Sequence, residues 1–192
     1  METVGAMRRV TAIAVIAASL VSVLAAALAW FGPPQRAAAT VSGLAWTEVA
    51  WPFPIDQWGK GKAFRCKAAD CGAEVNIYLR AKLGFCNCTT GVADDEDLDR
   101  MGDLVLVGEV SPLGAGRPIS IAWMKGRSRA YSLNARNPLG KTVISVVFNE
   151  RSDMIAATAV LGHDRSAAIE PGVIEFLNGN TVMRWAEIAL GL

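Results

Sequence analysis

The stretch FRCKAADCGAEVNIYLRAKLGFCNC, residues 64–88, decides the fold that we predict for this chain. Within it, residues 73–83 alternate apolar and polar side chains without a break. A period of two is typical of a β-strand that turns one face to a core and the other to water. A short strand over 63–66 precedes it, and residues 67–70 connect the two strands as a hairpin. We therefore expect the rest of the chain to cover this long strand.

The four cysteines of the chain, Cys66, Cys71, Cys86 and Cys88, all lie in this stretch. Cys66 and Cys71 bracket the hairpin turn, where opposed residues have Cβ atoms ~4.5–5.5 Å apart, and this distance suits a disulfide. The long strand would carry the chain about 35 Å away from Cys71 before the other two cysteines are reached. The spacing favours a Cys66–Cys71 disulfide and a separate Cys86 and Cys88 pair. A crossed pairing stays open if the chain turns back earlier, at 82–84.

One residue separates Cys86 from Cys88, and this C-x-C spacing has two interpretations. An even cysteine count in an exported protein indicates structural disulfides. A bridge across one residue is strained and easily reduced, and two thiols at this spacing can bind copper(I). Cys86 and Cys88 are thus either a structural pair or a redox or copper(I) site.

We predict no metal site and no cofactor elsewhere in the chain. The four cysteines do not follow a usual zinc spacing. In and just after the acidic run over 94–99, Asp97, Asp99 and Gly102 match positions one, three and six of an EF-hand loop, but Gly108 stands at position twelve, where the loop needs a glutamate. We predict no catalytic residue either, because the single histidine, His163, has no G-x-S-x-G serine elbow to work with.

Residues 1–39 have the pattern of a secretory signal. Two arginines precede an apolar run over 10–30, and A-x-A exits stand before Trp30 and before Thr40. The run is long enough to cross a bilayer core of about 30 Å, so an uncleaved inner-membrane anchor through residues 10–30 is the alternative to cleavage. We expect a protein that is exported to the periplasm or anchored to face it.

The net charge argues against one class of partner. The chain carries a formal charge of +1, and residues 1–39 contribute three arginines and one glutamate, so the mature chain is close to −1. A near-neutral domain is not typical of a dedicated nucleic-acid binder. We therefore expect no nucleic-acid partner.

Residues 40–62 form a segment rich in tryptophan and proline. It contains Trp46, Trp51 and Trp58, and the prolines of its WPFP run exclude a central strand because proline removes a ladder donor. The tryptophans have two interpretations: a surface for a sugar or a flat partner, or packing over one end of the sheet. We favour packing, because no cluster of polar groups is nearby in the sequence. The GKGK run at 59–62 lacks the phosphate-loop frame and is predicted to be a turn.

A short helix and a hairpin are predicted next. Asp94 caps the helix, acids fill its first turn, and Gly102 ends it. After a loop, strands over 119–123 and 128–133 flank a predicted turn at 124–127.

The last third of the chain predicts the centre of the sheet and two closing helices. Strands over 142–148 and 154–161 flank a turn at 149–153 and are apolar on both faces, so we expect them to be covered on both sides. Helices capped by Ser166 and Thr181 follow. The fold class is α+β: one disulfide-containing domain over 63–192, with helices packed on a mainly antiparallel sheet.

The element order over 64–192, which includes the hairpin TVISVVFNERSDMIAATAVL at 142–161 and the helix after it, resembles that of the PsbP-like sandwich group. That group includes photosystem accessory subunits and a GTPase-binding protein, so the resemblance implies a non-catalytic protein that binds a larger complex. The four cysteines are not part of the group's pattern, and no functional residue carries over.

Three functional hypotheses follow from the sequence. The first is an exported, non-catalytic accessory or binding protein of unknown partner. The second is a thiol redox or copper(I)-handling protein that uses Cys86 and Cys88. The third is an enzyme of unrecognised type, which needs a pocket that a sequence does not reveal.

Overall fold

The computed structural model describes residues 45–84, 91–133, 141–162 and 166–192. The strands in these ranges are β1 (Trp46–Val49), β2 (Lys62–Cys66), β3 (Val75–Lys82), β4 (Val110–Pro112), β5 (Arg117–Ile121), β6 (Met124–Leu133), β7 (Thr142–Glu150) and β8 (Asp153–Leu161). The helices are α2 (Ala68–Cys71), α3 (Asp95–Met101), α4 (Ser166–Leu177) and α5 (Asn180–Leu190), together with the 3-10 turn η1 (Leu104–Leu106). The fold is α+β, which confirms the predicted class.

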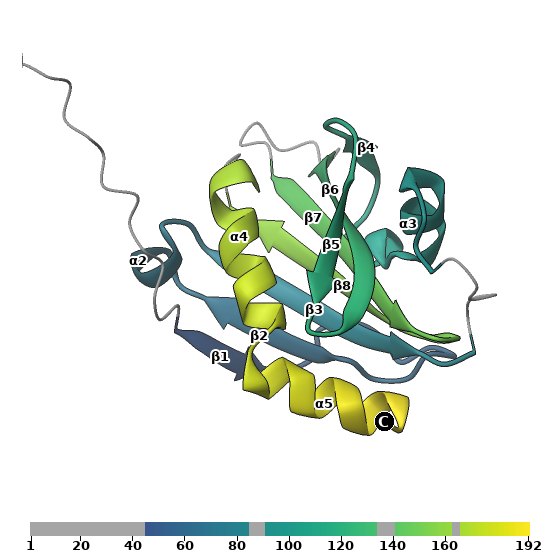
Figure 1. Cartoon of the computed structure of the whole chain (residues 1–192). Coiled ribbons are helices and arrows are strands. Elements are labelled where there is room, and N and C mark those ends of the chain that lie inside the picture. The colour runs from purple at the N-terminus through teal and green to yellow at the C-terminus, as the bar shows by residue number, and fades with distance from the viewer. Residues whose placement is uncertain (1–44, 85–90, 134–140, 163–165) are drawn as a thin grey trace, which may run out of the picture. The chain divides into compact units, whose positions relative to one another are not determined.

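The eight strands form one antiparallel sheet (Figure 1). The order is β1-β2-β3-β8-β7-β6, and the outer edge of β6 pairs with β5 over one part and with β4 over another. The predicted apolar pair, β7 and β8, lies at the centre of the sheet, and nearly every residue of both strands is buried. This confirms that the strands without a polar face are covered on both sides.

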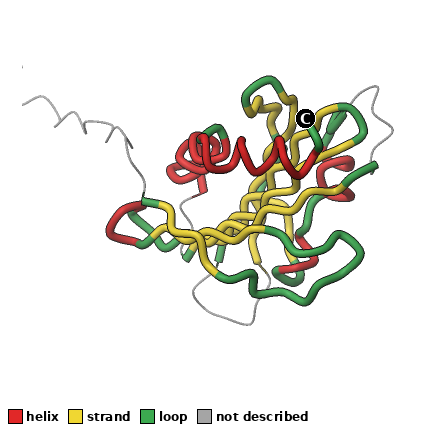
Figure 2. Tube along the Cα trace, turned by 90° about the horizontal axis from the view of Figure 1, so that it is seen from below, coloured by secondary structure: helices red, strands yellow, loops and turns green. Residues whose placement is uncertain are grey.

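One face of the sheet carries the two terminal helices (Figure 2). Their buried side chains pack on β3, β7 and β8 in the largest apolar cluster of the described residues. From the helices this cluster takes Val173, Leu177, Val182, Met183, Ala186 and Leu190. The aromatic ring of Trp46 in β1 extends the cluster, because it stacks on Phe176 of α4 with ring centroids 4.3 Å apart.

The other face carries α3 and η1 over two smaller apolar clusters. Leu98 and Met101 of α3 pack on β7 and β8, whereas Leu104 of η1 packs on β6 and β7. Ser145 and Thr158 are opposite each other on β7 and β8 and are fully buried. Neither hydroxyl has a hydrogen-bond partner among the described residues.

The long alternating strand is present as β3, but the prediction is correct for only one of its two faces. Val75, Ile77 and Leu79 are fully buried, as the alternation predicts. The opposite face of β3 does not turn wholly to water, since Arg80 and Lys82 are only 2% and 4% exposed. The connection after β1 and the chain that follows α3 cover this face, so local alternation alone does not decide burial here.

The β5–β6 hairpin exists, but its predicted turn is wrong. Ile121 pairs with Met124, so the turn is Ala122–Trp123, and Ala122 takes a positive φ of 50°. The MKGR run predicted as the turn lies within β6. Gly126 is required there for a different reason: a Cβ atom would collide with the carbonyl of Val147 and approach the Cβ of Phe148 to 2.7 Å.

The helix ends confirm one predicted cap and correct another. The side chain of Asp94 accepts a hydrogen bond from the backbone of Asp97 at 2.9 Å, and α3 ends at Gly102, as predicted. Helix α5 begins at Asn180, two residues earlier than predicted, and its N-cap is Gly179, so Thr181 lies inside the helix and does not cap it.

Candidate binding site

A buried ionic cluster holds the β1–β2 connection on the sheet. The guanidinium of Arg80 donates to both carboxylate oxygens of Asp103, at 2.8 and 2.7 Å, and to Asp56 at 2.6 Å. Lys82 donates to Asp103 at 2.9 Å and to the carbonyl oxygen of Met101 at 2.8 Å. Two cations face two anions, so the cluster is neutral as a whole. It ties residue 56 and the chain after α3 to the same strand.

Hydrogen bonds shift the pKa of two members of this cluster, Asp56 and Arg80. The backbone N–H of Trp58 and the guanidinium of Arg80 lower the pKa of Asp56 below its usual value. Burial alone would lower the pKa of Arg80, but its hydrogen bonds with Asp103 and Asp56 raise it. Both shifts favour the charged forms of Asp56 and Arg80, and the role of the cluster is to position the chain around it.

An open pocket of about 560 Å³ lies beside this connection, between the β1–β2 pair and α5. Its lining comes from both ends of the domain: Glu48, Val49, Ala50, Trp51, Lys60, Gly61, Lys62, Ala63 and Trp185. In Figure 1, α5 runs along the strands of this edge of the sheet. The rings of Trp51 and Trp185 are half-buried, so each keeps part of its surface accessible.

The ring of Trp51 is held by aromatic neighbours. Its centroid is 5.2 Å from that of Phe53 and 6.2 Å from that of Tyr78, both in edge-to-face geometry. Edge-to-face aromatic pairs of this kind stabilise a fixed ring orientation. The ring also lies against Gly61, where a Cβ atom would come within 2.6 Å of it and collide with the carbonyl of Leu79. A larger residue at position 61 would therefore displace Trp51 from the pocket wall.

The charged groups of the pocket leave one cation available. The ammonium of Lys62 bonds to the carboxylate of Glu48 at 2.5 Å. Lys60 is exposed and forms no ion pair with any residue in the described ranges. The pocket thus combines two aromatic surfaces with one excess positive charge.

The structure divides the tryptophans predicted in segment 40–62 between the two interpretations. Trp46 packs over the end of the sheet, as we expected, and Trp58 lies 5.8 Å from the ammonium of Lys82. Trp51 instead lines a pocket in which polar groups do gather, contrary to our expectation.

The GKGK run is not wholly a turn: the chain turns between Asp56 and Gly59, and Lys62 already belongs to β2.

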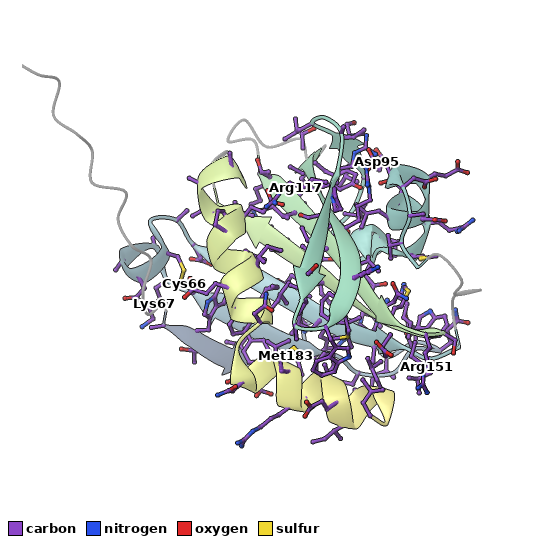
Figure 3. All side chains as sticks on the ribbon, in the orientation of Figure 1. Cys66, Lys67, Asp95, Arg117, Arg151 and Met183 are labelled. Carbon is purple, nitrogen blue, oxygen red and sulfur yellow. A yellow bond between two sulfur atoms is a disulfide. The ribbon has the colours of Figure 1, made fainter. Side chains whose placement is uncertain are left out.

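The predicted Cys66–Cys71 disulfide is present, and Figure 3 shows it at the end of β2 beside Lys67. The predicted geometry needs one correction. Cys66 is opposite Val75 in the sheet, whereas Cys71 ends the short helix α2, so the bridge closes a helical turn and does not join two opposed strand positions. Both cysteines are buried in the larger apolar cluster.

Several predicted features lie outside the described residues. These are the signal or anchor segment 1–39, the Cys86 and Cys88 pair and His163. No helix in the described ranges is long and apolar enough to span a membrane. No three His, Cys, Asp or Glu side chains of the described part are grouped as metal ligands.

A second ionic cluster holds the acidic helix α3 against β6. Asp95 accepts hydrogen bonds from the backbone of Gly116 and from Arg127, and these contacts lower its pKa. Asp99 accepts from Arg129 and from the hydroxyl of Tyr131, whose pKa is raised by burial and by this carboxylate. The acids of α3 therefore bind the helix to the sheet.

A second pocket of about 470 Å³ lies at the disulfide end of the sheet. Its polar lining includes Glu74, Asn76 and Lys141. Asn76 accepts a hydrogen bond from Arg65 at 3.0 Å and donates one to Glu74 at 3.2 Å. Glu74 and Asn76 are thus already bonded to each other, and no aromatic ring of the described residues lines this pocket, so the tryptophan-lined pocket is the better candidate site.

Sequence reasoning missed this pocket as a unit. The sequence places Trp185 in the last predicted helix, but it does not reveal that this residue lines the same pocket as the β1–β2 connection. The clustering of Trp51 with Lys60 and Lys62 in one Pro- and Gly-rich segment was the available signal, because loops held on a rigid sheet often carry binding residues.

No protein-family model matches the chain, and no curated protein sequence matches it.

Proposed function

We propose that this chain is an exported, non-catalytic accessory protein that binds another protein through the pocket lined by Trp51, Lys60 and Trp185. The observation that carries the proposal is the pair of half-buried tryptophan rings at one open pocket. Tryptophan is enriched among the residues that contribute most to protein–protein binding energy. An excess lysine at the rim adds a charge that selects and orients a partner.

The construction around Trp51 supports a preformed site. The ion pair of Arg80 with Asp56 holds the β1–β2 connection that contains Trp51, and Phe53 and Tyr78 contact the ring itself. A side chain that is already ordered loses less conformational entropy on binding. The pocket therefore has the features of a site that accepts a partner without large rearrangement.

The signal-like segment 1–39 and the disulfide support the exported location in this proposal. Disulfides persist in oxidising compartments such as the bacterial periplasm and are rare in the cytosol. The Cys66–Cys71 bridge is buried in the core, so its oxidation is part of the folded structure.

Site-specific photo-crosslinking in the producing cells tests the proposal. A photoreactive residue at Lys60 should give one discrete adduct with another protein. The same residue at Glu96, which is exposed on α3 over the other face of the sheet, should not. The substitution Trp185→Ala should remove the adduct, whereas Ile188→Ala, at a residue that is 82% exposed on the same helix, should leave it.

Two results would contradict this proposal. One is equal crosslinking from positions 60 and 96, which would mean that the pocket is not preferred. The other is robust turnover by the purified protein in a screen of hydrolase and oxidoreductase substrates, because the proposed role is binding and not catalysis.

A further inference from the structure

The strand next to the pocket has an open edge. β1 pairs with β2 and with no other strand in the described ranges, so it ends the sheet on that side. In an antiparallel edge strand, alternate backbone N–H and C=O groups point away from the sheet and have no strand partner. Thr47 and Glu48, in the middle of β1, are both exposed.

The open edge and the pocket are continuous. Glu48 and Val49 belong to β1 and also line the pocket, together with Ala50 and Trp51, which follow them in the chain. A peptide strand that adds to β1 would pass the mouth of the pocket. Side chains along an extended peptide alternate in direction, so one of them would face the two tryptophan rings.

The charge of this edge selects the kind of peptide. The two strands and the end of their connection carry three cations, Lys60, Lys62 and Arg65, against one anion, Glu48. Arg65 lies 3.9 Å from Glu74, and Lys62 is bonded to Glu48, so Lys60 is the least compensated. A complementary segment is therefore acidic.

We propose that the partner binds by strand addition: an extended, acidic segment pairs with the outer edge of β1 and places an apolar side chain between Trp51 and Trp185. The paired length is short, because Pro52 cannot continue a ladder as a donor. Main-chain hydrogen bonds then supply affinity, while the tryptophan pocket and Lys60 supply specificity. This inference rests on the proposed function, since it specifies how the same pocket is used.

A selection from a random-peptide display library against the folded protein tests the inference. The selected peptides should be acidic, free of proline in their central part and apolar at one fixed position. Lys60→Glu should weaken their binding about 10-fold, because an attractive surface charge becomes repulsive. A charge reversal at Arg151, which is 87% exposed in the β7–β8 turn, should leave binding unchanged.

Hydrogen exchange of the β1 amides provides the decisive measurement. The outward-facing amides of β1 should exchange quickly in the free protein and become protected when a selected peptide binds. Peptides methylated on alternate backbone nitrogens should lose this protection together with their affinity. Chain folding of each variant is checked by circular dichroism, so loss of binding is not confused with loss of structure.

The outcomes separate the inference from the proposed function. Selection of basic or proline-rich peptides, selection of no peptide, or binding without protection of β1 would overturn strand addition. The proposed function would still stand in those cases if the Lys60 position gives a specific adduct in cells. Absence of both the adduct and peptide binding would overturn the two together.

Discussion

Arg80 and Asp103, 23 positions apart in the chain, form a two-point ion pair inside the protein. Nε and Nη2 of the arginine donate to the two carboxylate oxygens at 2.8 and 2.7 Å, and the side chains are only 3% and 4% exposed. A bidentate arginine–carboxylate pair fixes geometry as well as charge. The pair joins β3, which carries Arg80, to the chain directly after α3, which carries Asp103.

Removal of the Asp103 carboxylate should destabilise the fold strongly. Asp103→Asn removes the carboxylate that Arg80 and Lys82 share inside the protein, and the remaining acid bonded to Arg80, Asp56, is exposed. Breaking a buried pair in this way costs about 3–5 kcal/mol of unfolding free energy. Equilibrium unfolding in urea measures this loss. Arg100→Gln is the control, because the ion pair of the exposed Arg100 with Asp97 on α3 contributes about 0.5 kcal/mol or less. A loss below about 1 kcal/mol for Asp103→Asn would contradict the role that we assign to this pair.

Acid should weaken both ionic clusters. Asp56 and Asp95 have folded-state pKa values below their usual range. Each therefore contributes stability that is complete above the ordinary aspartate pKa of about 3.9 and is lost as the pH falls through the lower folded-state pKa. The free energy of unfolding, measured from neutral pH down to about pH 2, should fall in this window. The double variant Asp56→Asn/Asp95→Asn should start lower and fall less, and an unchanged slope would show that other groups control acid unfolding.

Loss of the disulfide should cost a moderate amount of stability. The Cys66–Cys71 bridge spans a sequence separation of 5, and the stabilisation from closing such a short loop is at most roughly 2–3 kcal/mol. Cys66→Ala/Cys71→Ala is the suitable variant, because serine would bury an extra hydroxyl in the core. Urea unfolding of the variant against the oxidised parent gives the difference. A variant that does not fold at all would mean that the bridge does more than close a local turn.

The Cys86 and Cys88 pair should behave as a structural disulfide. Five acids between residues 94 and 99 follow it in the sequence, and nearby negative charge disfavours a reactive thiolate. Native alkylation followed by mass spectrometry, with and without mild reductant, should label neither cysteine. Selective labelling of Cys86 or Cys88 by a reductant that spares Cys66 and Cys71, or binding of copper(I), would support the redox or copper alternative.

The sequence predicts elements whose cause is local. The alternation of residues 73–83 predicts β3, the apolar runs predict β7 and β8, and Asp94 predicts the start of α3, because each signal lies within the element itself. Local reasoning fails where a distant segment changes the environment. Lys82 is buried by the chain after α3, and Gly126 is required by the backbone of β7, not by a turn.

The candidate site could be predicted only in part for the same reason. Trp51 and Lys60 are close in sequence, but the pocket also needs Trp185, which belongs to the last helix. That these residues line one pocket depends on the sheet order and on the packing of α5 on the sheet. Neither is readable from a single chain without knowledge of which strands pair.

The pairing of β3 with β8 has a consequence for the order of events during biosynthesis. Val75 is opposite Leu161, and Lys82 is opposite Met154. β3 can therefore form the hydrogen bonds of this edge only after β8, the last strand, has been synthesised. Pairings between distant segments are slow to form, and β3 lacks its β8 neighbour while the ribosome is still adding the rest of the chain. The nascent chain thus remains open until late in synthesis. For the export that we propose, this delay keeps the polypeptide threadable through a translocation channel before the sheet closes.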